Sequence, residues 1–396
     1  MSPDLSANSA GASVAPSRVV QHQRQLIGYK LARPGRLGSP RTELTLFERV
    51  SEFGPVLMGM EPIACIWHET AQMPEHEIPT NECGKARGGL MAKQVLVTGA
   101  SGFVGSHLAE ALEMQGHSVL AMTRQPDTYT GAGKPIFGDV HEPASLRSAL
   151  ADVDAAYYLV HSLARRDFVE KDAEAARSFA TAAADAGLER LIYLGGLGRD
   201  DANLSDHLRS RREVEHLLSS GGVPVTVLRA AIIIGHGSIS WEITRQLVAH
   251  LPAMVVPKWA TTRTQPIALT DVIGYLVRVL EPEAAKGRRF EIGGPEVLSY
   301  AEMMRRVAHL RHHRPLPMLA VPLLTPRLSS YWLSLVTDVN TTAARNLVDS
   351  MSNEVVVTNR SIDRVVPATP MSYDDAVREA FRQRTAAQAK SWTTDQ

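Results

Sequence analysis

One short stretch of this chain decides its fold: residues 98–105 read TGASGFVG. Directly before it, the apolar run Gln94–Thr98 predicts a short buried strand. Directly after it, apolar residues recur at the spacing of one helix face, at Val104, Leu108, Ala111 and Leu112. Gly116 then supplies a stop for this helix. The stretch is therefore predicted to be a glycine-rich turn that joins a buried strand to a helix.

Each glycine of this turn is expected to have its own physical role. Gly99 allows the tight turn out of the strand, Gly102 lets the backbone approach a phosphate, and Gly105 lets the helix pack close to the sheet. The N-terminus of the helix then presents free N–H groups and a positive dipole end. A tight turn that binds nothing is the alternative. We predict a loop that holds the pyrophosphate of a dinucleotide, formed by Gly99, Ala100, Ser101, Gly102, Phe103, Val104 and Gly105.

Strands and helices are predicted to alternate after this turn. Apolar runs predict further strands at residues 118–123, 135–138, 155–160, 190–194, 224–229 and 289–292. A helix with an alanine-rich face is predicted at residues 172–186. Strands separated by helices imply right-handed crossovers and a parallel sheet that is covered on both faces. The predicted fold class is therefore α/β, a doubly wound parallel sheet of the Rossmann type.

The chain is predicted to divide into several parts. Residues 1–90 are rich in Ser, Ala, Gly and Pro and sustain no period, so we expect a disordered extension or residues upstream of a true start at Met91. Residues 91–295 are predicted to form the Rossmann domain, with an excursion at 236–265. Residues 296–370 are predicted to form a smaller carboxyl-terminal lobe for substrate, and residues 371–396 a helix and tail.

Composition excludes several classes of partner. Lys plus Arg and Asp plus Glu each number 42, so no global charge attracts nucleic acid. Two cysteines in 396 residues suit a reducing cytoplasm. We expect no secretory signal and no membrane span, because no basic stretch precedes an apolar run and no apolar stretch approaches about 20 residues. The possible zinc ligands match no compact finger, so no metal site is predicted; they are Cys65, His68, His76 and Cys83.

Two positions after the second and third strands bear on the choice of cofactor. Arg124 stands where an acidic residue would bind the ribose 2′-hydroxyl of NAD, and its guanidinium suits a 2′-phosphate. NADP is therefore favoured, with NAD as the alternative; Arg124 can also be a solvated surface residue. Asp139 and Val140 follow the third strand at a position able to contact the adenine. Asp139 can instead cap the helix that begins near Pro143.

These residues resemble the short-chain dehydrogenase/reductase superfamily in its extended and atypical branches. The first marker is TGASGFVG at residues 98–105. Later stretches are similar to a bacterial atypical branch related to NmrA-like proteins and to the 39-kDa accessory subunit of respiratory complex I. They are YYLVHS at 157–162, YLGGL at 193–197, RAAIIIG at 229–235 and LSSYW at 328–332. The resemblance covers about residues 93–370 and implies the fold and dinucleotide binding, but it does not specify a reaction.

The superfamily's catalytic pair is a Tyr followed four residues later by a Lys, and this chain departs from it. His207 stands at the Tyr position and Arg211 at the Lys position. The resemblance then implies that His207 handles the proton and that Arg211 fixes the nicotinamide ribose. A cationic Arg211 would also lower the pKa of a nearby imidazole. A structural or binding role for both residues is the alternative, because residues one helical turn apart share a face whatever they do.

Other residues are predicted to lie where open α/β sheets bind ligands. His161 and Ser162 follow the fourth strand at its carboxyl end, so His161 is predicted to contact the cofactor. Ser162 can instead be a helix cap, and His161 can merely line the cleft. Gly195 and Gly196 end the fifth strand, where many relatives carry a catalytic Ser. The missing hydroxyl weakens the interpretation as a reductase.

Basic residues precede an apolar stretch in the carboxyl-terminal part of the chain. Arg305, Arg306 and residues 311–314 come before the apolar residues 316–324, which prolines interrupt. This pattern is typical of a protein that lies on an anionic membrane surface. We therefore expect a cytoplasmic protein that can contact the inner face of the plasma membrane. A hydrophobic substrate lobe with a solvated basic rim is the alternative, and both interpretations fit a lipophilic substrate such as a quinone or isoprenoid.

The sequence thus predicts an NADP(H)-binding atypical member of this superfamily. The predicted activity is that of an oxidoreductase acting on a hydrophobic carbonyl or quinone-related compound. The rival prediction is a non-catalytic protein of nucleotide sensing or of respiratory or quinone-pathway assembly. An isomerase or epimerase with transient hydride transfer is a third interpretation. The oligomeric state is left open.

Overall fold

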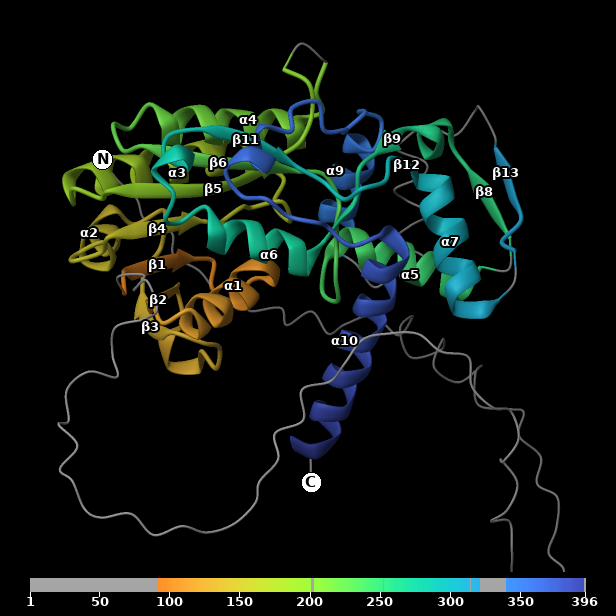
Figure 1. Cartoon of the computed structure of the whole chain (residues 1–396), viewed down its shortest axis with the longest axis horizontal. Helices are drawn as coiled ribbons and strands as arrows, with labels where there is room; N and C mark the ends of the chain where they lie inside the picture. Colours follow the sequence, from red (N-terminus) through yellow and green to blue (C-terminus); the bar gives the residue numbers. More distant parts are fainter. Residues whose placement is uncertain (1–91, 201–202, 252, 314, 321–339, 395–396) are drawn as a thin grey trace, which may run out of the picture. The chain divides into compact units, whose positions relative to one another are not determined.

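Seven parallel strands form the central sheet in the computed structural model, which describes residues 92–200, 203–251, 253–313, 315–320 and 340–394 (Figure 1). Strand order reverses beside β1, which pairs with β2 on one side and β4 on the other. In open α/β sheets such a reversal opens a crevice at the carboxyl ends of the strands. The strands are, in spatial order, β11 (Arg289–Ile292), β6 (Val225–Ala230), β5 (Arg190–Gly196), β4 (Ala155–Tyr158), β1 (Gln94–Thr98), β2 (Ser118–Thr123) and β3 (Lys134–Phe137).

Helices cover both faces of this sheet, as predicted for a doubly wound fold (Figure 1). Val95 and Val97 of β1 pack into one core with α1 and α6, and Leu96 packs into another core on the opposite face. This alternation arises because successive side chains of a strand point to opposite faces. The covering helices are α1 (Phe103–Met114) and α6 (Leu269–Arg278) on one face, and α2 (Pro143–Ala149), α3 (Phe168–Asp185) and α4 (Asp206–Ser219) on the other.

Near the crevice, two elements are longer than predicted, and β4 is shorter, since it ends at Tyr158 rather than at residue 160. Helix α3 begins at Phe168 rather than at residue 172, and Phe168 is buried. The charged residues around Phe168 hide this from the helical pattern. Strand β5 continues to Gly196 rather than ending at residue 194, because Gly196 still pairs with Ala230 of β6. The predictions for residues 1–90 lie outside the described residues.

A third hydrophobic core, apart from the two on the faces of the sheet, gathers elements from the later part of the chain. It joins helices of the predicted excursion at 236–265 to helices that follow residue 296. Trp241 is fully buried in this core and packs edge-on against Phe381. The elements around it are α5 (Ile239–His250), α7 (Tyr300–His312), α9 (Thr341–Ser350), α10 (Tyr373–Thr394) and the parallel pair of β8 (Met254–Val256) and β13 (Met318–Ala320).

Short strand pairs lie between the core of α1 and α6 and the core around Trp241, since Ile267 packs in the former and Ala268 in the latter. Strand β7 (Ile233–Ile234) pairs with β10 (Ile267–Ala268), and β9 (Arg263–Thr264) pairs with β12 (Leu298–Ser299). These short elements bring the chain after β6 and before α6 alongside the mouth of the crevice. The 3₁₀ turns are η1 (Pro126–Thr128), η2 (Lys258–Thr261), η3 (Glu283–Ala285) and η4 (Ser361–Arg364).

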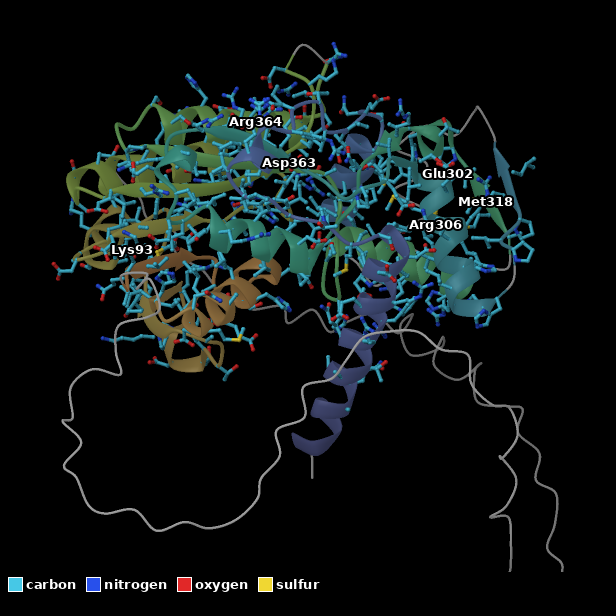
Figure 2. All side chains as sticks on the ribbon, viewed as in Figure 1. Lys93, Glu302, Arg306, Met318, Asp363 and Arg364 are labelled. Carbon is cyan, nitrogen blue, oxygen red and sulfur yellow. The ribbon has the colours of Figure 1, made fainter. Side chains whose placement is uncertain are left out.

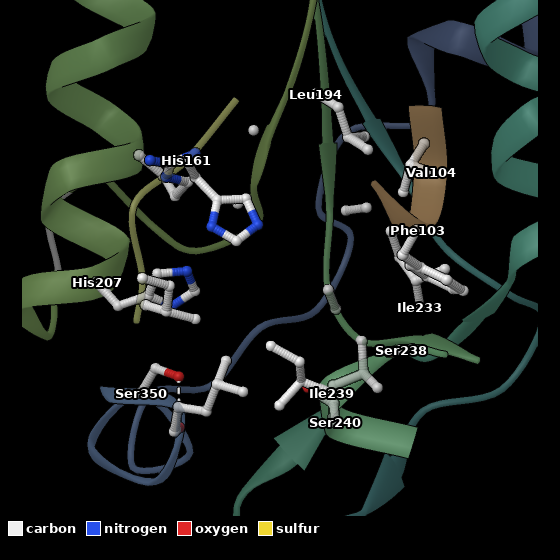
Figure 3. A pocket seen from close by; sticks show the side chains of 18 of the residues that line it. Phe103, Val104, His161, Leu194, His207, Ile233, Ser238, Ile239, Ser240 and Ser350 are labelled. Carbon is white, nitrogen blue, oxygen red and sulfur yellow. Dashed lines mark hydrogen bonds between the residues drawn. The ribbon is translucent and has the colours of Figure 1, made fainter. Parts of the chain in front are cut away.

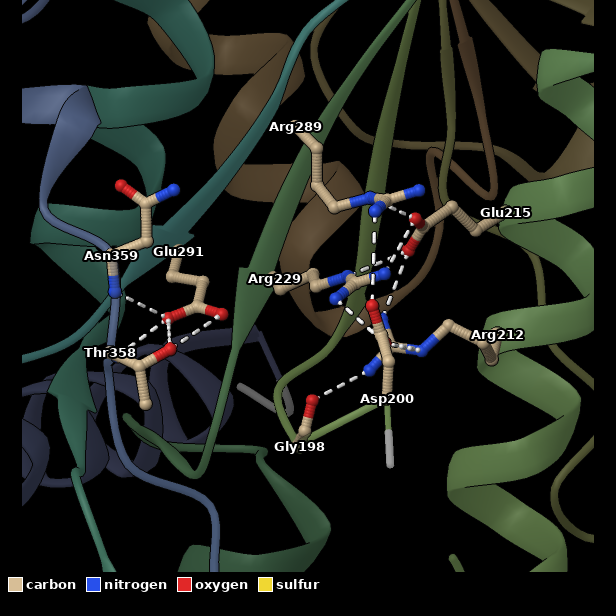
Figure 4. A network of polar contacts seen from close by, with 9 residues as sticks. All are labelled: Gly198, Asp200, Arg212, Glu215, Arg229, Arg289, Glu291, Thr358 and Asn359. Atoms are coloured by element: carbon tan, nitrogen blue, oxygen red, sulfur yellow. Dashed lines mark hydrogen bonds and ion pairs between the residues drawn. The ribbon is translucent and has the colours of Figure 1, made fainter. Parts of the chain in front are cut away.

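A buried ionic network fixes α4 to the far edge of the sheet (Figure 4). Arg229 of β6 forms two hydrogen bonds to Glu215 of α4, at 2.7 and 2.9 Å, and both side chains are almost completely buried. Arg289 of β11 also contacts Glu215. Nearby, the carboxylate of Glu291 accepts backbone N–H bonds from the segment after α9, including that of Thr358 at 2.6 Å. These bonds hold the later segment against β11.

Candidate functional site

The loop between β1 and α1 has the geometry that its glycines predicted. Gly99 adopts a positive φ of 66°, and the N–H of Gly102 donates to its carbonyl oxygen at 2.8 Å. The first main-chain bond of α1 runs from Ser106 to the carbonyl of Gly102. The three preceding N–H groups, from Phe103 to Gly105, therefore have no acceptor within the helix. The first turn of α1 contains no acidic side chain, so its end suits an anion.

Gly105 is required by a close approach of main chain to main chain. A Cβ at Gly105 would overlap the carbonyl oxygen of Gly99 and would lie 3.0 Å from the Cα of Ala100. Gly105 was expected to let α1 pack close to the sheet, but the close contact is with the main chain of the loop. Ala100 is fully buried, main chain included, whereas Ser101 is exposed. The loop and the first turn of α1 are therefore in direct main-chain contact at Gly105.

A cavity of about 310 Å³ extends from this loop across the carboxyl ends of the strands (Figure 3). Gly99, Gly102, Phe103, Val104 and Gly105 line it at the loop. The same cavity is bordered by further predicted site residues, namely His161, His207 and Arg211. Its remaining wall is mainly apolar and comes from β5, from the chain after β6, and from α9. One cavity therefore brings together the predicted phosphate loop, the predicted proton-handling residue and a hydrophobic surface.

The other predicted cofactor residues lie outside this cavity, at the same edge of the sheet. The parallel register of β1, β2 and β3 places Arg124 and Asp139 just beyond their strands. Arg124 is exposed and has no hydrogen bond or ion pair with any described residue. Asp139 accepts a bond from the N–H of His141 at 2.9 Å and does not cap α2, whose N-cap is Glu142. Val140 is buried in the core.

His161 and His207 are held in their neutral forms at pH 7. His161 is exposed because its ring opens onto the cavity, but protein encloses its other sides. This enclosure, followed by the charge of Arg211, lowers the pKa of His161 to about 4. Burial, followed by Arg211 and then His161, lowers the pKa of His207 to about 3. An imidazolium acid is therefore scarce at neutral pH, but a neutral ring still offers one N–H donor.

Arg211 is bound to a partner that the sequence patterns did not reveal. Its guanidinium contacts the carboxylate of Asp172 in α3, and both side chains are buried. Asp172 also accepts the N–H of Ser162 at 2.7 Å, so Ser162 is not a helix cap. A signal was present, since Asp172 occupies the alanine-rich face of its helix, four residues before Ala176. A carboxylate at such a position is buried and needs a cationic partner.

Hydroxyl groups line the cavity, but none belongs to the end of β5. That end consists of Gly195 and Gly196, where a Cβ on Gly196 would approach Leu208 to 3.0 Å. Ser238 and Ser240 border the side opposite the histidines (Figure 3). Ser350 of α9 donates its hydroxyl to the carbonyl of Leu347 at 2.6 Å. The residues predicted to stand at the Tyr and Lys positions thus offer an imidazole and a guanidinium group to this cavity.

One of the basic residues in the carboxyl-terminal lobe forms ion pairs within the protein. Arg306, labelled in Figure 2, bonds to Asp374 at 2.7 Å and also to Glu296. These bonds fasten α7 to α10 and occupy one of the charges that suggested a membrane surface. The apolar residues 321–339 lie outside the described ranges. Within those ranges, no helix is both long enough and apolar enough to cross a bilayer.

Comparison with known proteins identifies the loop and its crevice. Residues 99–253 match a family model described as NAD(P)H-binding. The chain carries an NAD(P)H-binding domain. This match and the fold agree with the predicted resemblance to the short-chain dehydrogenase/reductase superfamily. The domain begins at the predicted phosphate loop.

Curated relatives and solved structures are similar to this NAD(P)H-binding domain at low identity. Sterol demethylase protein B of Methylococcus capsulatus is 24% identical over 59% of this chain and 78% of its own. Ceramide reductase of Caulobacter vibrioides is 24% identical over 56% and 71%. The crystal structure of Citrobacter triphenylmethane reductase with NADP(H) has a TM-score of 0.59 and 16% identity, over 72% of this chain and 99% of that one. The chain spans 23% of the length of the mycobacterial proteins that it also matches.

Proposed function

We propose that this chain is an NADP(H)-dependent reductase that acts on the carbonyl group of a hydrophobic molecule. The observation that carries the proposal is the single cavity that joins the phosphate loop to His207 and to an apolar wall. When bound, the reduced nicotinamide would supply a hydride. The relatives named as a sterol demethylase protein, a ceramide reductase and a triphenylmethane reductase support a hydrophobic substrate.

Each end of the proposed site has residues suited to its task. The free N–H groups of Phe103, Val104 and Gly105 would hold the pyrophosphate, since nothing in α1 occupies them. Arg124 would bind the 2′-phosphate, because its guanidinium is exposed and unpaired among the described residues. His207 would hydrogen-bond the carbonyl oxygen through a neutral N–H group. Arg211, neutralised by Asp172, would fix the ribose side of the cavity.

The preference for NADP is tested by reversing one charge. Arg124→Asp should weaken NADPH binding by about 10- to 150-fold, because one charge-assisted contact contributes about 1.5–3 kcal/mol. NADH binding should stay the same or improve. Arg147→Asp makes the same change on the exposed face of α2 and should alter neither affinity. Calorimetry on the full chain with NADP⁺, NADPH, NAD⁺ and NADH measures these affinities. Equal weakening of NADPH and NADH binding would contradict the assignment of Arg124 to the 2′-phosphate.

Reductase activity is tested by oxidation of NADPH in the presence of hydrophobic carbonyl compounds. Decanal, 2-undecanone and menadione serve as probes, and His207→Ala should abolish turnover while it spares NADPH binding. A specific observation favours a second function: Arg211 is engaged by Asp172, and β5 ends without a hydroxyl. A protein that uses NADP(H) as a sensing or structural ligand would bind the nucleotide tightly and oxidise it with none of these probes.

A further inference from the structure

Two histidines from separate elements line the same wall of the cavity. His161 follows β4, and His207 lies in the first turn of α4. Figure 3 shows the two rings one above the other on the side opposite Ile233 and Ser238. The carboxyl ends of β4 and β5, from which these residues follow, flank the crevice in which a nicotinamide would lie. Both rings therefore border the place of reaction.

The two rings differ in their access to solvent. His161 is exposed, whereas His207 is only partly exposed and its Nδ1 atom is buried. This Nδ1 has no hydrogen-bond partner among the described residues. A buried ring nitrogen without a partner costs free energy, so its presence beside a cavity indicates a ligand or a transient partner.

The charged groups around the histidines already have partners. Arg211, from the next turn of α4, is bound to Asp172 of α3. Tyr193 of β5 donates its hydroxyl to the carbonyl oxygen of Arg211 at 3.1 Å. A guanidinium stays protonated, and Tyr193 cannot lend its proton without breaking its bond to Arg211. The neighbouring imidazole is then the titratable group that Figure 3 shows beside each ring.

We propose that His161 and His207 form a proton relay from solvent to the oxygen of the substrate carbonyl. The inference rests on the proposed function and adds a second residue to it. The carbonyl carbon gains a C–H bond and two electrons from NADPH, which is oxidised to NADP⁺, and the C=O double bond becomes single. The oxygen then takes a proton from an N–H of His207. His207 takes a proton from His161 on its other nitrogen, and His161 takes one from water.

The neutral state of both rings suits this relay. A neutral imidazole carries one N–H and one lone pair, so it can accept a proton on one nitrogen while it donates from the other. Neither ring then has to remain charged beside Arg211, whose positive charge disfavours an imidazolium. The net reaction consumes one NADPH, one carbonyl group and one proton, and it yields an alcohol. No acidic tyrosine is required.

A double-mutant cycle tests the relay. His161→Gln and His207→Gln should each lower kcat by about 100-fold or more, the usual contribution of proton transfer, and His207→Gln should leave NADPH affinity unchanged. The kcat of the double variant should be no lower than that of the more damaged single variant, because both residues serve one path. His216→Gln alters an exposed histidine of the same helix and should change nothing. Losses that multiply to about 10,000-fold in the double variant would overturn the relay.

A second readout needs no turnover and keeps the test decisive. In nitrogen-15 NMR, His161→Gln should raise the pKa of His207, because the two rings act on each other. An unchanged pKa would show that the rings are not coupled and would overturn the relay even if the enzyme is active. If wild-type protein oxidises NADPH with none of the carbonyl probes, the proposed function fails and the relay fails with it. Active protein with independent histidines overturns the relay alone.

Discussion

Replacing Asp172 by Ala should destabilise the protein severely. Its carboxylate is 3% exposed and faces the guanidinium of Arg211, which is also buried. Without Asp172, the positive charge stays in the interior with no counter-charge. Breaking one partner of a buried pair costs about 3–5 kcal/mol. The N–H of Ser162 also loses its acceptor, so the upper part of this range is expected.

The expected loss is large enough to measure without ambiguity. A domain of this size shifts in Tm by about 2–4 °C per kcal/mol, so Tm should fall by about 6–20 °C. Chemical denaturation followed by circular dichroism gives the free energy of unfolding, and thermal scans give Tm. Asp172→Asn should fall between wild type and Asp172→Ala, because its amide oxygen still accepts the Ser162 N–H but carries no charge.

Glu174→Ala provides a matched control on the same helix. Glu174 pairs with Lys171 at 2.7 Å, but its side chain is 54% exposed. Such surface pairs contribute about 0–1 kcal/mol, so this variant should unfold nearly like wild type. If Asp172→Ala lost no more stability than Glu174→Ala, Arg211 would have to be solvated or paired elsewhere. The argument that α3 and α4 are locked by a buried ion pair would then be refuted.

Further predictions concern the loop and the histidines. Gly105→Ala should lower the free energy of unfolding by about 1–3 kcal/mol, because its Cβ would overlap the Gly99 carbonyl. It should also lower NADPH affinity, measured by calorimetry, at least tenfold. Gly274→Ala in α6, whose Cβ meets only Arg278 at 3.6 Å, should instead be neutral or stabilising. The pKa values of His161 and His207 are lowered to about 4 and 3, so the unfolded chain binds more protons below pH 6.5. Stability should therefore fall as pH drops from 6.5 to 4, and unfolding titrations should show a smaller fall in His207→Gln; an equal fall would mean that His207 titrates normally.

Local sequence patterns predicted the glycine-rich loop and most of the strands of the sheet. The glycine-rich turn, its strand and its helix depend on residues within a few positions of one another, and all three lie where the sequence predicted them. The start of α3 was missed, because Phe168 is buried although charged residues surround it in the sequence. Gly196 likewise joins β5 only through its pairing with Ala230 of β6.

By itself, the sequence determined the glycine-rich loop between a strand and a helix and the parallel α/β class, since each is written in adjacent residues or in a short period. Only the tertiary structure decided that Arg211 is neutralised by Asp172, 39 residues away, and that His161 shares a cavity with His207. The reason is physical: charge pairing and loss of solvent depend on which surfaces the crossovers bring together. A local sequence pattern does not show which distant residues the fold brings into contact.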